Sequence, residues 1–234
     1  MELIEVLPGR LHLLRFSVGQ AYLWQDPGSL TLIDTGPAGS GRAIAEVVEA
    51  LGRQPGDVRR VILTHFHDDH AGAAAEVRTW GNGVMLAHRL DASVIRGLIP
   101  GPPPQLTDAE RDLYARVVTT GGIPSAPAAR VDVEVGDGDL VDFGGGAAVV
   151  GTPGHTDGSI AIYLPEHRLV FTGDSAARTP DRRVVLGPFN TDRDRAIDSL
   201  RCLAELDADV ACFGHGDPVM TGASGMLHAA ADRP

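Results

Sequence analysis

The stretch Thr64-His65-Phe66-His67-Asp68-Asp69-His70 directly follows the apolar run Val61–Leu63. His65 and His67 alternate as on an extended segment, so both imidazole rings can point to one side. Asp69 and His70 come in the turn that follows and point to a neighbouring position. A lone histidine at a strand end is usually a hydrogen-bonding residue, but four crowded donors without a cation would leave buried polar groups unpaired, at about 1–3 kcal/mol each. The stretch therefore predicts a metal site.

Other metal-capable side chains follow three more apolar runs, and a glycine flanks each of them, as expected where the backbone turns tightly beside a site. Taken singly, each is a weak signal, because a histidine or a Gly-Asp pair is common in turns. Ligands placed at one edge of a sheet nevertheless converge in space, and together they complete two coordination shells. The runs and the donors that follow them are Ala147–Val150 with His155, Leu169–Phe171 with Asp174, and Val210–Phe213 with His215.

The rest of the chain alternates short apolar runs with helical patterns. Ile44, Val47, Val48 and Leu51 mark one face of a helix. Thr107 with Glu110 predicts a capped helix through Val118, and Thr191 with Asp194 predicts a cap for a helix that carries Ile197, Leu200 and Leu203. Further strands are expected at Leu11–Phe16, Ala21–Trp24, Leu30–Ile33, Val84–Ala87 and Ile160–Leu164.

Residues from about 97 to 122 resemble an insertion in an otherwise single domain that spans residues 1–234. The Pro-rich stretch 100–104 can continue neither a helix nor a strand ladder, and a capped helix follows it. Both a lid over a pocket and a surface elaboration fit this pattern.

The composition favours a small-molecule partner. The net charge is −11, from 20 basic and 31 acidic residues, and no Lys/Arg-rich run predicts binding to nucleic acid or to an anionic membrane. No apolar run approaches the roughly 20 residues of a membrane helix. The first residues carry two acids and no apolar core of a signal peptide, and Cys202 and Cys212 are expected as thiols, so the expected location is the cytoplasm.

The motifs resemble, in order, those of the metallo-β-lactamase superfamily. The similarity covers Leu32–Gly36, Thr64–Gly72, Gly154–Ser159, Thr172–Asp174 and Gly214–Gly216, and so runs from about residue 30 to 217. The fold that this resemblance implies is α/β: an αββα sandwich of two mixed β-sheets flanked by helices.

The resemblance also implies a role for each donor, with no position of the motifs missing. One ion would be held by His65, His67 and His155, a second by Asp69, His70 and His215, and Asp174 would bridge both. Two zinc ions per chain are expected, although imidazole and carboxylate also accept manganese, iron or cobalt. The hypothesis is a metal-dependent hydrolase in which a metal-bridging hydroxide attacks an acyl carbon and Asp69 takes the proton.

Single residues separate the activities of such relatives. Asp174 argues against β-lactamases with this His-rich pattern, which lack a bridging aspartate, and Ser175–Arg178 lacks the tyrosine of N-acyl-homoserine lactonases. Arg178 occupies a position near the one where glyoxalase II enzymes have a basic residue, but the 97–122 segment departs from the pattern of those enzymes. Nuclease members usually need a basic surface. An ester, lactone or thioester hydrolase is expected; β-lactam or phosphodiester hydrolysis, iron-dependent persulfide dioxygenation and a non-catalytic scaffold stay open as alternatives.

Several other residues are interpreted more plainly. Asp34 could orient a ligand histidine or close a turn. Thr156 and Ser159 are expected to fix the His155 loop, and Asp68 to face solvent. His88 is expected to be a satisfied polar residue near the pocket. The histidines expected at the surface are His12, His167 and His228.

Overall fold

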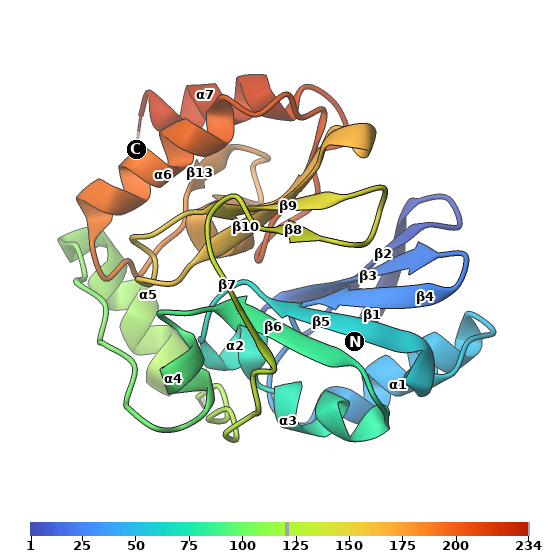
Figure 1. Ribbon diagram of the computed structural model, residues 1–234. Helices are drawn as coiled ribbons and strands as arrows, with labels where there is room; N and C mark the ends of the chain where they lie inside the picture. The colour runs from blue at the N-terminus through green and yellow to red at the C-terminus, as the bar shows by residue number, and fades with distance from the viewer. Residues whose placement is uncertain (120–121, 234) are drawn as a thin grey trace. The chain divides into compact units, whose positions relative to one another are not determined.

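The computed structural model describes residues 1–119 and 122–233 (Figure 1). The chain divides into two compact units: unit 1 comprises Met1–Pro100 and Ile123–Val135, and unit 2 comprises Gly101–Gly122 and Gly136–Pro234. Each unit contains its own mixed sheet and its own buried apolar cluster. The prediction of a single domain over the whole chain stays a prediction.

Unit 1 contains a seven-stranded sheet in the simple order β1 to β7. The pairs β1-β2, β2-β3 and β3-β4 are antiparallel, whereas β4, β5, β6 and β7 run parallel to one another. Parallel neighbours end at the same edge, so loops that follow β4, β5 and β6 come together. The strands are β1 (Glu2–Leu7), β2 (Leu11–Arg15), β3 (Gln20–Asp26), β4 (Ser29–Ile33), β5 (Val58–Leu63), β6 (Val84–His88) and β7 (Val133–Val135).

The helices of unit 1 share one apolar cluster with this sheet. Ile44, Val47 and Val48 on α1 are buried in that cluster together with Leu32 on β4, as the helical spacing of the three predicts. The helical segments are α1 (Gly41–Ala50), η1 (Pro55–Asp57), α2 (Asp68–Ala71), α3 (Ala74–Val77), η2 (Arg78–Trp80) and α4 (Ala92–Ile95).

Unit 2 contains a five-stranded sheet in the order β14-β11-β10-β9-β8 and a two-stranded ribbon, β12-β13. Only β11 and β14 are parallel; the other pairs are antiparallel. The strands are β8 (Leu140–Val141), β9 (Ala147–Gly151), β10 (Ile160–Leu164), β11 (Leu169–Phe171), β12 (Ala176–Arg178), β13 (Val184–Leu186) and β14 (Val210–Cys212).

Helices α6 and α7 bury Leu200, Leu203 and Leu227 in the cluster that also contains Ala161 and Val170 of the five-stranded sheet. Figure 1 shows these two helices side by side, in orange and red. The helical segments of unit 2 are α5 (Asp108–Thr119), η3 (Pro165–His167), η4 (Gly173–Ser175), α6 (Arg193–Ala204) and α7 (Ala223–Ala231).

The predicted elements are largely confirmed, with one helix start displaced. The N-cap of α6 is Asp192, whose side chain accepts a hydrogen bond from the Arg195 N–H at 3.1 Å, and not Thr191. Thr191 is occupied elsewhere, because its hydroxyl donates to the Gly154 carbonyl at 3.1 Å. The predicted helix in the 97–122 segment is present as α5; residues 120 and 121 of that segment lie outside the described part.

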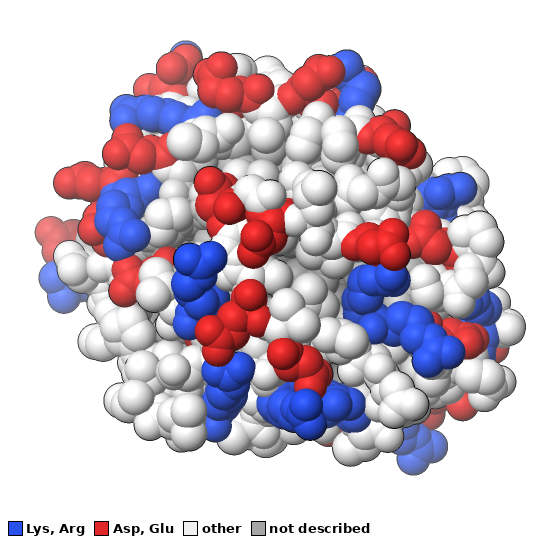
Figure 2. Space-filling model, viewed as in Figure 1, with Lys and Arg blue, Asp and Glu red and all other residues white. Residues whose placement is uncertain are grey.

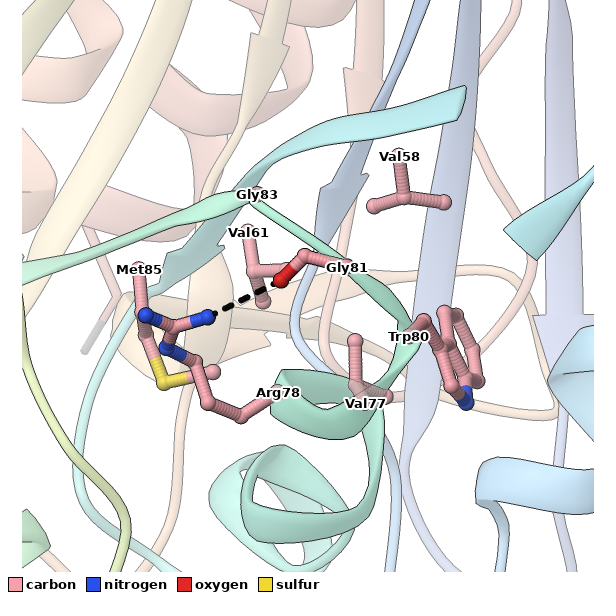
Figure 3. Close-up of a pocket in the computed structure, with 8 residues that line it drawn as sticks. All are labelled: Val58, Val61, Val77, Arg78, Trp80, Gly81, Gly83 and Met85. Atoms are coloured by element: carbon pink, nitrogen blue, oxygen red, sulfur yellow. Dashed lines mark hydrogen bonds between the residues drawn. The ribbon is translucent and has the colours of Figure 1, made fainter. Parts of the chain in front are cut away.

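The surface carries mixed charge, and one small pocket lies away from the predicted donors. Acidic and basic side chains are interspersed over the face drawn in Figure 2. Figure 3 shows the pocket between Val58, Arg78, Trp80 and Met85, with room for about one water molecule, where Arg78 donates to the Gly81 carbonyl at 3.2 Å. Val58 begins β5, whereas the histidine motif follows its other end. None of the described helices combines the length and the apolar character needed to cross a bilayer.

Candidate metal centre

The edge of unit 1 is organised around Asp34, the residue that follows β4. Ile33 pairs with Ile62 on the parallel strand β5, so Asp34 and Thr64 leave the sheet side by side. The Asp34 carboxylate accepts hydrogen bonds from the Thr64 N–H at 2.7 Å and the Thr64 hydroxyl at 2.8 Å, and it lies 2.8 Å from Nδ1 of His70. Asp34 is buried and has a φ of 59°, a left-handed conformation that aspartate tolerates better than most residues.

This network determines which ring nitrogen of each histidine carries a proton. A carboxylate only accepts, so Nδ1 of His70 donates to Asp34, and in the neutral imidazole Nε2 then carries the lone pair. The single hydroxyl proton of Thr64 goes to Asp34, so Nδ1 of His65, 3.0 Å from that oxygen, must donate to it. Nε2 of His65 therefore also carries its lone pair. Asp34 thus orients two predicted ligands, which decides between the two roles considered for it in favour of the orienting role.

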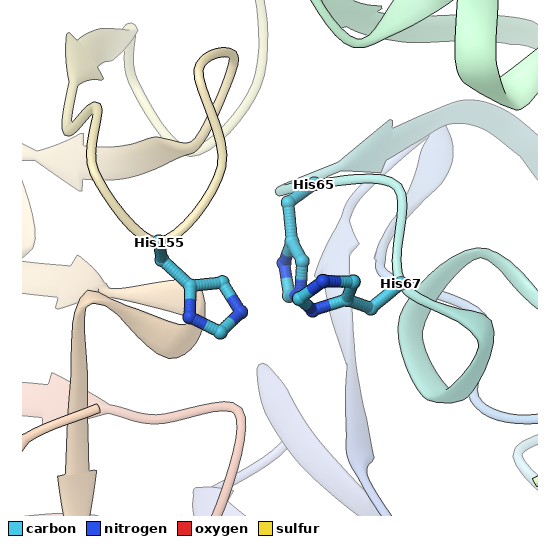
Figure 4. Close-up of side chains that lie close together, drawn as sticks. All are labelled: His65, His67 and His155. Carbon is cyan, nitrogen blue, oxygen red and sulfur yellow. The ribbon is translucent and has the colours of Figure 1, made fainter. Parts of the chain in front are cut away.

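The other donors of unit 1 lie close to these two. The rings of His65 and His67 lie close together (Figure 4), with their centroids 4.7 Å apart, and the centroids of His65 and His70 are 4.2 Å apart. Asp69 is buried in α2, with Oδ2 3.7 Å from Nε2 of His70. Four predicted donors of unit 1 therefore gather at one edge of its sheet.

Backbone contacts hold this cluster in place. Thr35 donates to the His70 carbonyl through both its N–H and its hydroxyl, at 2.7 and 2.8 Å. Asp91, which comes after β6, accepts a hydrogen bond at 3.1 Å from the N–H of Phe66, the residue between His65 and His67. Gly19 lies against Asp69, where an added Cβ would come within 2.5 Å of the Asp69 carbonyl oxygen.

In unit 2 the register of two parallel strands brings Asp174 and His215 together. Phe171 on β11 pairs with Cys212 on β14. Asp174 comes three residues after Phe171, and His215 comes three residues after Cys212. Oδ2 of Asp174 lies 3.2 Å from Nε2 of His215 and 3.7 Å from Nε2 of His155. His155 and Asp174 are buried, whereas 36% of the His215 side chain is exposed.

His155 stands in the loop that joins β9 to β10 (Figure 4). The Ser159 side chain accepts from the Thr156 N–H at 2.9 Å, and the two hydroxyls are also 2.9 Å apart. Both side chains are buried and serve to shape the loop, as the sequence predicts. On the other side, the Thr191 N–H donates to the His155 carbonyl at 3.2 Å.

Arg178 supports the loop that carries His215. Its N–H donates to the His215 carbonyl at 3.0 Å, and its guanidinium donates to the Pro218 carbonyl at 2.6 Å. Gly216 lies against the same residue, because an added Cβ would overlap the Arg178 carbonyl oxygen. The basic side chain thus contacts backbone carbonyls beside the predicted ligand.

The donor chemistry within each unit fits a zinc-sized ion. Two tetrahedral ligands that each lie about 2.0–2.1 Å from zinc are about 3.4 Å apart. The three carboxylate–imidazole separations are 3.2 Å for Asp174 and His215, 3.7 Å for Asp174 and His155, and 3.7 Å for Asp69 and His70. All three are close to that value, and the two longer ones exceed a hydrogen bond.

Two expectations were wrong. His12 is buried on β2, not at the surface, and burial lowers its pKa although Glu5, 3.9 Å away, opposes the shift. Asp68 does not simply face solvent: it is partly buried and accepts from the Ala126 N–H at 2.7 Å. His88 is a satisfied polar residue, as expected, since its Nδ1 accepts from the Leu90 N–H at 3.2 Å. Asp91 was missed, and its only signal in the sequence is an acid just beyond a strand.

Comparison with known families and proteins agrees with this picture. The sequence model described as Metallo-beta-lactamase superfamily matches residues 14–215. A protein of Bacillus subtilis described as probable metallo-hydrolase YflN is 27% identical over 233 residues, which cover 91% of this chain and 85% of that protein. A hydroxyacylglutathione hydrolase of Cereibacter sphaeroides is 27% identical over 199 residues, 83% of this chain, and the chain spans 61% of that relative.

A solved structure of a metallo-beta-lactamase family protein from Thermus thermophilus is similar along almost the whole chain. The TM-score is 0.69 at 25% identity, and the match covers 97% of this chain and 78% of the other. Together with the two mixed sheets and their helices, this similarity confirms the predicted α/β fold class.

Proposed function

Because the chain belongs to the metallo-β-lactamase superfamily and is a metal-dependent hydrolase, we propose that it is a binuclear enzyme that cleaves a small acyl substrate: an ester, a lactone or a thioester. The observation that carries the proposal is the presence of every donor of the family pattern, four in unit 1 and three in unit 2. A small molecule as partner and a cytoplasmic location belong to the same proposal.

In this proposal the seven donors form the binuclear centre that the family pattern implies. As the family resemblance implies, the first ion would be held by His65, His67 and His155, the second by Asp69, His70 and His215, and Asp174 would serve both. Zinc is the proposed metal, because its usual ligands are carboxylate oxygens and imidazole rings. An imidazole with a proton on Nδ1 and a lone pair on Nε2 is ready to bind it.

The residues of the chain prepare and serve this centre. Two divalent ions would supply a hydroxide nucleophile at neutral pH and positive charge opposite a developing oxyanion. Asp34 holds His65 and His70 in the tautomer that binds through Nε2. Asp69, buried in α2, is the proposed proton acceptor during hydrolysis.

The contacts of Arg178 bear on the substrate class. A glutathione thioester carries carboxylates that a cationic side chain could anchor. The guanidinium of Arg178 instead donates to the Pro218 carbonyl at 2.6 Å, so this side chain is committed to the protein's own backbone. This contact favours a substrate without a carboxylate anchor at this position.

The test is metal analysis followed by a substrate panel on the purified, zinc-loaded protein. Lactones, esters, thioesters, phosphodiesters and β-lactams are assayed side by side, with chelator-treated protein as the control and zinc added back to it. About two zinc ions per chain, with acyl hydrolysis lost on chelation and regained with zinc, is the expected result.

Other outcomes point to the alternatives. A single iron per chain with oxygen uptake indicates dioxygenase chemistry and overturns the proposal. Hydrolysis confined to phosphodiesters or β-lactams overturns the acyl assignment. A fully metallated protein that cleaves nothing across the panel favours a binding scaffold.

A further inference from the structure

Helix α5 and the residues just before it contact a single loop of unit 2, residues 187–192, at three points. The Glu110 carboxylate accepts a hydrogen bond from the Phe189 N–H at 3.0 Å. The Gln105 N–H donates to the Asn190 carbonyl at 2.8 Å. The rings of Tyr114 and Phe189 meet edge to face, 5.2 Å between centroids. A helix that only decorated the surface would not need this set of directed contacts.

The same loop supports two predicted metal ligands. At one end, Gly187 lies so close to the Asp174 carbonyl oxygen that an added Cβ would overlap it. At the other end, the Thr191 N–H donates to the His155 carbonyl at 3.2 Å. The next residue, Asp192, donates through its N–H to the Gly154 carbonyl at 2.9 Å. The backbone of the loop thus connects α5 to two of the three donors of unit 2, Asp174 and His155.

Phe189, in the middle of the loop, has a backbone conformation that must be maintained by its surroundings. Its φ is 64°, in the left-handed region, which costs a residue with a bulky side chain about 1–2 kcal/mol. The hydrogen bond from its N–H to Glu110 and the contact with Tyr114 act on this one residue. Such strain persists only where the surrounding structure over-determines it.

We propose that Glu110 is a positioning residue of the hydrolase: its carboxylate holds Phe189 and thereby fixes the loop that supports His155 and Asp174. The inference rests on the proposed function, since it concerns the ligands of the same centre. It also gives the 97–122 segment a role that is neither a lid nor a simple surface elaboration.

The charge of Glu110 suits this role. Burial raises its pKa, but hydrogen bonds from Thr107 and from the Phe189 N–H, with Arg193 nearby, outweigh burial and bring the pKa below its ordinary value. The group is therefore ionised at neutral pH. One oxygen accepts from the N–H and hydroxyl of Thr107, at 2.8 and 2.7 Å, while the other accepts from Phe189. A charged acceptor makes the stronger kind of hydrogen bond.

Three variants of the full-length protein separate positioning from the mere stability of α5. Glu110→Ala removes the contact with Phe189. Glu110→Gln keeps one carbonyl oxygen that can accept from the Phe189 N–H. Thr107→Val is the matched control: it removes the hydroxyl that donates to one oxygen of Glu110 at the start of α5, but it does not change either partner of the hydrogen bond between Phe189 and the other oxygen.

Two readouts are used on each variant: zinc affinity from competition with a chromogenic chelator, and hydrogen exchange of the 187–192 segment in metal-free protein. For Glu110→Ala we expect zinc affinity to fall about tenfold, at the low end of the effect of losing an indirect support of a ligand. Exchange of the 187–192 segment is expected to accelerate. Thr107→Val should stay close to wild type in both measurements. Glu110→Gln should fall between wild type and Glu110→Ala, because a neutral amide oxygen accepts a weaker hydrogen bond than a carboxylate.

The outcomes distinguish the inference from the proposed function. Unchanged exchange and unchanged zinc affinity in Glu110→Ala overturn the inference, while a zinc-binding wild type keeps the function standing. Equal losses in Thr107→Val and Glu110→Ala also overturn it, because they trace the effect to helix stability. If the wild type binds no zinc, the proposed function fails and the inference falls with it. Faster exchange in Glu110→Ala would then show only that Glu110 restrains the 187–192 loop.

Discussion

Replacing Asp34 with asparagine exchanges one carboxylate oxygen for an NH₂ group in the middle of the unit 1 network. The amide keeps the size and the left-handed backbone of aspartate, since asparagine also tolerates a φ of 59°. Its oxygen can still accept from the Thr64 N–H. The NH₂ group, however, then faces Nδ1 of His70 and the Thr64 hydroxyl, which both donate in the wild type. The amide group would therefore place a hydrogen-bond donor opposite two other donors.

The simplest relief is to move the proton of His70 from Nδ1 to Nε2, and this places it on the atom proposed to bind metal. Loss of such an outer partner of a ligand histidine costs about 10–100-fold in metal affinity. That range corresponds to about 1.4–2.8 kcal/mol. His65 is affected in the same direction, because the Thr64 hydroxyl, to which its Nδ1 donates, loses its acceptor. We therefore expect a loss of zinc affinity towards the upper end of the range.

The assay is zinc competition with a chromogenic chelator at constant pH, together with thermal unfolding of the metal-free protein. Asp68→Asn is the matched control: it is a neighbouring aspartate whose one oxygen, which accepts from the Ala126 N–H, can be replaced by the amide oxygen. The control should bind zinc as the wild type does. The metal-free Asp34→Asn protein should unfold cooperatively, which shows that the fold survives.

Wild-type zinc affinity in a correctly folded Asp34→Asn protein would refute the reasoning, because the tautomers of His65 and His70 could then not depend on this carboxylate. An equal loss in Asp68→Asn would refute it too, since the effect would then come from the charge of the region and not from the hydrogen bonds of Asp34.

Three further predictions follow from the same geometry. Asp174→Asn should lower hydrolysis in the panel by more than about 100-fold, since even indirect supports of a ligand cost about 10–100-fold, while thermal unfolding stays cooperative; full activity and full metallation would contradict the mechanism. Gly216→Ala should lower the free energy of unfolding by about 1–3 kcal/mol, because φ is 93° and the new Cβ would overlap the Arg178 carbonyl. Gly222→Ala is the control: it has open space around it and should show only the smaller cost of its φ of 69°. Equal effects of the two variants in urea denaturation would contradict the clash. The stability that Glu110 contributes should be fully present above its ordinary pKa of 4.5 and should disappear as pH falls through its lowered value, so the wild type and Glu110→Gln should converge in denaturation experiments in acid; a gap that widens in acid would contradict the direction of the shift.

The sequence predicted the strands and the donors well because both depend on local signals. Apolar runs mark the buried strands, and a metal-capable side chain beside glycine marks the loop that follows each run. The match between β11 and β14 illustrates this: Phe171 pairs with Cys212, so the equal offset of Asp174 and His215 from their strands carries over into space. The edge strand β1, the short edge strands β7 and β8 and the β12-β13 ribbon were not predicted; β1 and β7 contain acidic residues between their apolar ones.

The supports of the donors could not be predicted, because they depend on contacts between distant parts of the chain. Asp91 reaches the Phe66 N–H across 25 positions, and Asp68 reaches Ala126 across 58. An acid that bonds its own turn and an acid that bonds a distant backbone look alike in a sequence. The same holds for His12, whose burial depends on how the antiparallel strands β1, β2 and β3 pair around it.

The supports of the donors in the two units predict that Asp34 and Glu110 are sensitive positions, although neither is a proposed ligand. A ligand imidazole can rotate about its own bonds, so its position depends on the second ring nitrogen or on the backbone that carries it. Asp34 acts on the ring of His70 directly, whereas Glu110 acts on the backbone beside His155 through Phe189 and Thr191. A change at Asp34 should therefore alter tautomer and metal affinity together, while a change at Glu110 should alter loop exchange first and metal affinity as a consequence. The order of these effects, measured in the two variants, distinguishes an electrostatic support from a mechanical one.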